Sequence, residues 1–307
     1  MSVQADKAPR RSLGSFIASQ IELVGGWSAA LGALLIIVIC LAALLAPWVA
    51  PFDPVATDFR ARLKPPSWAH WMGTDQAGRD IMSRLIWGAR ASLKVSFGAA
   101  VIGTLLGVSL GLAAARFRGG IVDNLIMRTV DAIASIPLLI WAIAVIGTIG
   151  PVPIVLGPIT LQNEDKLLML IGVLYLPMMT RVTYTVASAE KMADYVKARV
   201  LQGVSQGRIM LGDVLPNCLS PIIVQVTFLI AVGLIVEAAV SFIGLGVQPP
   251  RPSWGTMLAD ARPYILGPEW WLSFFPGLVI SLTVIGFNLL GDGLREAADP
   301  RRMAHGA

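Results

Sequence analysis

The chain has 307 residues, of which 55% are hydrophobic and only 14% are charged. The apolar residues form blocks that are too long for the buried helices of a soluble protein, which excludes a soluble globular fold. The formal net charge of +5 is accounted for by basic segments at a membrane surface, so it requires no nucleic-acid partner. Because a bilayer core offers no water to backbone groups, these blocks predict spanning helices and an all-α polytopic membrane protein.

The first apolar run lies between Trp27 and Trp48. At 1.5 Å per residue this run spans roughly 30 Å, the thickness of a bilayer core, and tryptophan side chains favour its two interfaces. A signal peptide would have a shorter apolar core, so residues 27–50 are predicted to form an uncleaved first transmembrane helix. Residues 1–26 carry apolar residues at helical spacing beside Arg10 and Arg11, which predicts a cytoplasmic amphipathic segment on the membrane surface. A disordered basic tail is the alternative.

Residues 51–94 are predicted to form a periplasmic loop with an interfacial helix. Residues 95–292 are predicted to form the transmembrane core, followed by a cytoplasmic tail over 293–307. Five apolar runs in the core predict spans, six in all, at about 95–115, 124–149, 167–186, 222–244 and 270–291. Arg181 interrupts the fourth of the six, so five spans remain possible.

Short basic segments favour one orientation of the chain in the membrane. With six spans both termini lie on one side, and most of the short basic segments fall on that side, which the positive-inside rule makes cytoplasmic. The loop over 51–94 also carries basic residues, so the charge bias supports this orientation without deciding it.

Catalytic and cofactor motifs are not found in the sequence. It contains no G-x-x-x-x-G-K-[ST] phosphate loop, so the chain is predicted to bind no ATP in that manner. Cys40 and Cys218, the only cysteines, are predicted near opposite faces, which excludes a disulfide between them. Cys218 is expected to react with thiol reagents from the cytoplasm and Cys40 to be buried in lipid. We predict no catalytic residue, no metal site and no cofactor on this chain.

Residues 187–221 form the one long polar interruption between two apolar runs in the second half of the chain. Gly203 predicts a turn there, since glycine reaches backbone angles closed to other residues and lets another surface approach. The turn continues through Val204, Ser205 and Gln206. Apolar residues on both sides are expected to form a groove, namely Tyr195, Val196, Val200, Ile209, Met210 and Leu211. A solvated loop with an ordinary helix cap is the alternative.

Three glycines and two carboxylates stand out within the spans. Gly103, Gly107 and Gly111 recur every four residues, which predicts a face for close helix packing, either within the chain or against another one. Glu237 and Asp131 lie inside predicted spans, where a carboxylate costs about 3 kcal/mol. They are predicted to line or gate a pathway. The alternative is a structural hydrogen bond or ion pair.

The proline-rich segment Val247 to Glu269 is predicted to fold along the outer face of the membrane. With Trp68, Trp71 and Trp87, its Trp254 would make an aromatic outer surface that serves either for docking and gating or for interfacial anchoring alone.

Three long segments carry a family resemblance. MGTDQAGRDIMSRLIWGARASL (72–93), SFIGLGVQPPRPSWGTMLADARPYIL (241–266) and FNLLGDGLREAADPR (287–301) resemble ABC transporter permeases of the dipeptide, oligopeptide and nickel family, of the dipeptide-permease C type. The similarity runs from about Pro51 to Arg302. Residues 187–221 resemble the EAA loop by which such permeases dock on the ATPase. The matching residues are Asp194, Ala198, Gly203, Leu215 and Pro216, and Lys197 and Arg199 depart from the family pattern.

The resemblance implies a type I ABC importer permease fold in a bacterial inner membrane. It also implies a heterodimer with a second homologous permease, two cytoplasmic ATPase subunits that bind ATP and Mg²⁺, and a periplasmic or lipid-anchored substrate-binding protein. The implied function is inward transport of di- or oligopeptides, or a related small solute, by alternating access. One alternative function is an ion-coupled secondary transporter or channel that uses Glu237 and Asp131, and a membrane scaffold without transport is another.

Overall fold

The computed structural model describes residues 26–150 and 152–297. The predicted amphipathic segment, apart from Gly26, and the end of the predicted tail lie outside the described residues. The elements in chain order are α2 (Gly26–Leu44), α3 (Ala46–Val49), η1 (Phe59–Ala61), α4 (Ile81–Arg116), α5 (Ile121–Ala134), α6 (Leu138–Ile149), β1 (Ile154–Leu156), β2 (Ile159–Leu161), α7 (Asn163–Leu174), α8 (Leu176–Glu190), α9 (Asp194–Leu201), α10 (Gln206–Arg208), η2 (Ile209–Val214), α11 (Leu215–Phe242), α12 (Trp254–Ala261), η3 (Arg262–Tyr264) and α13 (Trp271–Ala297). The two short strands form an antiparallel hairpin in which Val155 pairs with Thr160.

Among the described residues, five helical stretches are long and apolar enough to cross a membrane, or six if the bent pair α5 and α6 counts as one. The fold class predicted from the sequence is therefore confirmed. The interrupted span is the third and not the fourth, because α5 and α6 meet at 80°. Pro137, at the start of α6, explains the break, since it lacks an N–H and disfavours helical angles at the residue before it.

Helix α4 begins at Ile81 and runs without a break for 36 residues. No boundary exists near residues 94 and 95, where the sequence analysis separated an interfacial helix from the second span. The side chain of Asp80 accepts a hydrogen bond from the backbone N–H of Ser83 and so caps the helix. Ile81, Leu85 and Leu93 are buried on one face, which extends the packed surface of the span outward.

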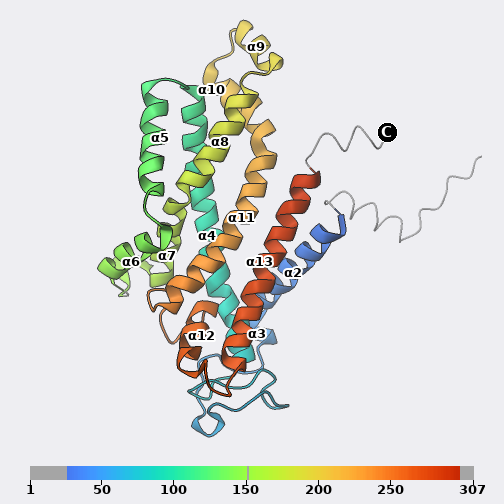
Figure 1. The fold of residues 1–307 in the computed structure, drawn as a ribbon, viewed down its shortest axis with the longest axis vertical. Helices are drawn as coiled ribbons and strands as arrows, with labels where there is room; N and C mark the ends of the chain where they lie inside the picture. The colour runs from blue at the N-terminus through green and yellow to red at the C-terminus, as the bar shows by residue number, and fades with distance from the viewer. Residues whose placement is uncertain (1–25, 151, 298–307) are drawn as a thin grey trace, which may run out of the picture.

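Helix α4 lies at the centre of the bundle, in contact with α7, α8 and α11, while α2 packs on α13 at one side (Figure 1). The three glycines of α4 face α7 and α8 of the same chain. A Cβ atom at Gly103, Gly107 or Gly111 would lie 2.6 Å from the Cβ of Tyr175, Met179 or Thr183, respectively. These glycines therefore permit close packing inside the chain.

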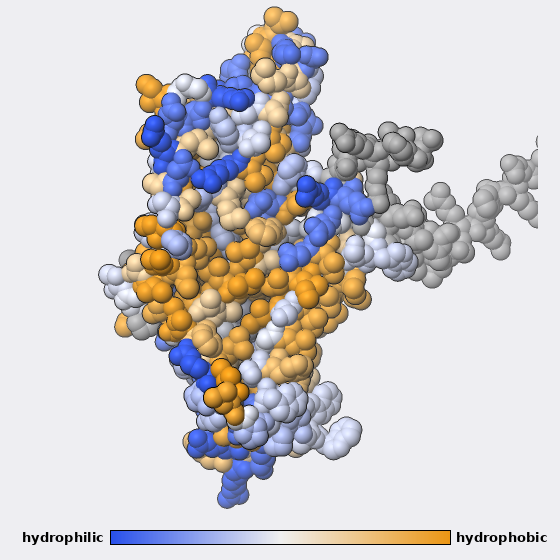
Figure 2. Space-filling model, viewed as in Figure 1, coloured by the Kyte–Doolittle hydropathy of each residue, from blue (hydrophilic) through white to orange (hydrophobic). Residues whose placement is uncertain are grey.

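An apolar belt crosses the middle of the molecule, with hydrophilic residues at both ends (Figure 2). At one end is α9. At the other is a structure that we call the cap, made of residues 50–80 and 247–270 (Figure 1). The described start of α2 and end of α13 lie on the side of the belt where α9 projects.

Buried ion pairs hold the cap on α4. Arg84 bonds Asp75 at 2.5 Å and Asp260 of α12 at 3.0 Å, and Arg79 reaches the same two carboxylates at 2.7 and 3.4 Å. Trp254 is 1% exposed, and its indole N–H donates to the carbonyl of Leu85 at 3.0 Å.

The expectation that Trp254 belongs to an aromatic outer surface is therefore wrong. Trp68 and Trp71 are exposed, at 97% and 66%, and Trp87 is half-buried. The segment around Trp254 folds into a short helix instead, which begins with Ser253 accepting from the N–H of Thr256 and packs onto α4 and α11.

Candidate functional site

The α9 loop, residues 191–214, projects from the end of the bundle opposite the cap (Figure 1). It contains α9, a turn at Gly203, α10 and the π turn η2. Gly203 has φ +76°, and its N–H donates to the carbonyl of Val200 while that of Val204 donates to Arg199. These two bonds form a Schellman motif, which ends α9 at a position that favours glycine. A Cβ at Gly203 would meet no atom within 4 Å, so the outer side of the turn is open.

The apolar residues of the loop divide between its two sides. Val196 and Ile209 are buried in the main core, so the expectation that they form a groove is wrong, whereas Met210 lines the pocket described below. Val200 and Leu201 are exposed instead, at 45% and 89%, and Leu211 lines the pocket beneath the loop. The loop is thus anchored by apolar packing beneath and presents apolar side chains above.

Polar contacts fix the base of the loop. The hydroxyl of Tyr195 donates to Glu190 at 2.6 Å and accepts from Asn217 at 2.9 Å. Lys191 donates to the carbonyls of Ala115 and Arg116, at 2.9 and 3.0 Å, and so caps the end of α4. Burial, followed by the charge of Arg118, lowers the pKa of Lys191. Burial and the hydrogen bond to Glu190 raise the pKa of Tyr195.

The two residues that depart from the family pattern have partners inside the loop. Lys197 pairs with Asp194 at 2.8 Å, and Arg199 with Asp213 at 3.3 Å. The side chain of Asp194 is 98% exposed. Ala198, Ser205 and Gln206 are exposed as well, and Val204 is half-buried.

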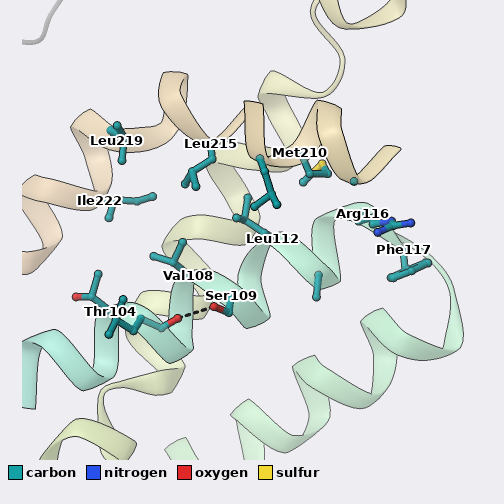
Figure 3. Close-up of a pocket in the computed structure, with 14 residues that line it drawn as sticks. Thr104, Val108, Ser109, Leu112, Arg116, Phe117, Met210, Leu215, Leu219 and Ile222 are labelled. Carbon is teal, nitrogen blue, oxygen red and sulfur yellow. Dashed lines mark hydrogen bonds between the residues drawn. The ribbon is translucent and has the colours of Figure 1, made fainter. Parts of the chain in front are cut away.

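A pocket of about 530 Å³ lies beneath the loop, between α4 and the segment from α10 into α11 (Figure 3). Leu112, Met210 and Leu215 line it with apolar side chains, and Arg116 lies at its edge. Pro216, next to Leu215, is exposed. The pocket leaves space between the end of α4 and the helix that carries the loop.

Glu237 lies far from this pocket, near the cap. It is fully buried and accepts hydrogen bonds from the hydroxyls of Ser92 at 2.8 Å and Ser241 at 2.7 Å. The backbone N–H of Trp254 donates to Ser92 at 3.2 Å. Through these bonds Glu237 joins α4, α11 and the start of α12.

Asp131 is in a different environment. Its carboxylate pairs with Arg181 of α8 at 2.6 Å, and the two side chains are 60% and 52% exposed. The structure therefore does not bring Asp131 and Glu237 together. The ion pair also explains how α8 accommodates Arg181 within a span.

Sequence reasoning missed the buried ion pairs of the cap. Their partners are up to 181 residues apart, so no local pattern relates them. Cys218 is buried, which disfavours the expected reaction of this thiol with reagents from the cytoplasm. Among the residues that the structure describes, no group of three or more His, Cys, Asp or Glu side chains could hold a metal ion.

Comparison with known proteins identifies the family. Residues 103–303 match the binding-protein-dependent transport system inner membrane component, and residues 27–66 match the N-terminal transmembrane domain of oligopeptide transport permease C. This chain belongs to the family of binding-protein-dependent transport permeases. Membership confirms the resemblance seen in the sequence and favours an ABC importer permease over an ion-coupled transporter or a scaffold.

Two similar permeases align with nearly the whole chain. The di/tripeptide transport system permease protein DppC of Pseudomonas aeruginosa is 43% identical over 88% of this chain and 87% of its own length. The dipeptide transport system permease protein DppC of Escherichia coli is 41% identical over 89% of each.

Among solved structures, the MetNI methionine ABC transporter in inward-facing conformations matches with a TM-score of 0.56. It covers 71% of this permease and 98% of that chain at 17% identity. The shared fold is that of a type I ABC importer permease, a multi-pass protein of the inner membrane.

Proposed function

We propose that this permease moves di- or oligopeptides, or a closely related small solute, into the cell. The observation that carries the proposal is its 43% identity to a di/tripeptide permease over 88% of the chain. The proposed assembly pairs it with a second homologous permease, two cytoplasmic ATPase subunits that bind ATP and Mg²⁺, and a periplasmic or lipid-anchored binding protein. No cofactor binds to this chain itself.

In this proposal the α9 end is cytoplasmic and the cap is periplasmic, with both termini in the cytoplasm. The open turn at Gly203 and the exposed Val200 and Leu201 form the surface that docks on an ATPase subunit. Apolar side chains at the tip of a polar loop support this role, since a partner would remove them from water.

Asp131 and Glu237 take different parts. Asp131, exposed and paired with Arg181, belongs to the pathway surface that meets substrate or the second permease. Glu237 positions the outer gate, because its hydrogen bonds link two spanning helices to the start of α12.

Uptake of a radiolabelled dipeptide by cells that express the whole transporter tests the function. Uptake should stop when ATP is depleted and survive a proton uncoupler that leaves ATP intact. Uptake that follows the proton gradient and ignores ATP would contradict the proposal.

Sidedness is tested separately with single cysteines in a Cys40→Ala, Cys218→Ala background. A membrane-impermeant thiol reagent added to intact spheroplasts should label Trp68→Cys in the cap and leave Leu201→Cys unlabelled. The reverse pattern would overturn the orientation.

A further inference from the structure

A charged surface and an apolar groove adjoin on the outer part of α4. The charged pocket, about 400 Å³, is lined by Arg90, Lys94, Arg251 and Glu164 together with Trp87. The groove, about 320 Å³, lies between α2 and α4 and is lined by Cys40, Ala43, Leu44, Leu93 and Phe97. Arg90 and Lys94 line both. The two basic residues therefore stand where a polar site passes into an apolar one.

The level of this site along the bundle matches the edge of the membrane. Leu44 is the last residue of α2, and Glu164 lies in the first turn of α7, at the cap end of another span. Trp48, one turn beyond Leu44, is 79% exposed, as expected of an aromatic residue at the interface. Lipid phosphates lie at this level of a bilayer.

The charges leave Arg90 available for an anion. Lys94 already pairs with Glu164 at 2.8 Å and Asp165 at 2.6 Å, and Arg251 approaches Glu164 at 3.6 Å. Arg90 stacks over the ring of Trp87 at 5.1 Å. Within the described part of the chain, no carboxylate lies within ion-pairing distance of Arg90.

The surface below Arg90 suits an acyl chain. Leu44 and Phe97 expose part of their side chains beside the groove, and Val101 continues the exposed apolar face along α4. On α2, Ile37 and Leu41 are also about half exposed, so this helix presents an apolar face beside the groove. A ligand that bears a phosphate at one end and a hydrocarbon chain at the other would match both halves of the site.

We propose that this site binds an anionic phospholipid of the outer leaflet, with its phosphate on Arg90 and Lys94 and one acyl chain in the groove between α2 and α4. A bound lipid would hold α2 against α4. The outer-leaflet assignment rests on the proposed orientation, in which the cap is periplasmic, and the proposal is independent of the transported solute.

The test uses native mass spectrometry to measure how tightly dioleoyl phosphatidylglycerol binds to the purified, detergent-solubilised transporter. Arg90→Gln removes the phosphate contact, and Arg90→Lys keeps the charge. A charged hydrogen bond of about 1.5–3 kcal/mol corresponds to at least about a tenfold weaker Kd for Arg90→Gln. Arg60→Gln, at an exposed position of the cap outside both pockets, should bind as the unmodified chain does.

Cys40→Phe tests the other half of the site, since it fills the groove and leaves the charged residues unsubstituted. It should also reduce phosphatidylglycerol binding, whereas inorganic phosphate should neither bind measurably nor displace the lipid.

Equal lipid binding by the unmodified chain and Arg90→Gln would overturn the proposal. The proposal would also be overturned if the unmodified transporter retained no lipid. Competition by millimolar phosphate, with Cys40→Phe unaffected, would identify a site for free anions and sink the lipid assignment.

Discussion

The cap and the α9 loop are both built from polar segments at the ends of the bundle, yet they are held in opposite ways. In the cap, Asp75 is buried and pairs with the buried Arg84 of α4, and the indole N–H of Trp254 donates to the carbonyl of Leu85 in α4. In the α9 loop the ion pairs are partly exposed, and Leu201 points into open space. A buried network resists deformation, whereas exposed apolar side chains favour a partner. The part of the cap that packs on α4 is thus held within this chain, while Trp68 and Trp71 are exposed elsewhere in the cap. In the proposed function, the α9 loop contacts another chain.

Arg84→Ala should have the largest effect on stability. Asp75 keeps Arg79 as its remaining ion-pair partner, so the cost should be at most about 3–5 kcal/mol, the cost of leaving a buried charge without a partner. The measurement is thermal unfolding of the purified permease. Arg199→Ala breaks the partly exposed pair in the loop and should cost at most about 1 kcal/mol. Equal losses for the two variants would remove the contrast between the regions.

Glu237→Ala should come next. It removes the acceptor for the hydroxyls of Ser92 and Ser241, and an unsatisfied buried polar group costs about 1–3 kcal/mol. Glu237→Gln has nearly the same shape and can bond both hydroxyls, so it should leave assembly intact. Transport then separates the two roles for Glu237, because a purely structural residue keeps uptake in the glutamine variant. Normal uptake and stability in both variants would exclude any role for it.

Leu201→Ser should change stability least. The side chain is almost wholly exposed, and substitutions at such positions usually change the unfolding free energy by less than about 0.5 kcal/mol. If this leucine docks on an ATPase subunit, the variant should retain less ATPase during purification than Trp68→Ser, a matched exposed position in the cap. ATPase retention equal to that of Trp68→Ser would place the docking surface elsewhere.

The sequence predicted the fold class, the family and most spans, because apolar runs and the motifs of residues 72–93, 241–266 and 287–301 are local signals. It also placed Gly203 in a turn. It did not predict which side of the α9 loop is buried, since Val196 and Leu201 look alike in a sequence and differ only in what packs beneath them. The ion pairs of Arg84 and the link from Glu237 to Ser92 depend on long-range packing, which local periodicity does not contain.

The most direct test of the central claim compares Gly203→Asp with Gly203→Asn. Both side chains have nearly the same shape, and both tolerate a positive φ better than other non-glycine residues. A Cβ at this position would meet no atom within 4 Å, and the two variants differ in charge, so the comparison isolates a negative charge at the proposed docking surface. The transporter is purified through a tag on this chain, and membrane abundance, co-purified ATPase and substrate uptake are measured. We predict normal abundance for both variants, with ATPase and uptake lost only in Gly203→Asp. Full retention of ATPase and uptake in Gly203→Asp would contradict the account. The α9 loop would then only connect α8 to α11 at the surface, without docking on an ATPase subunit.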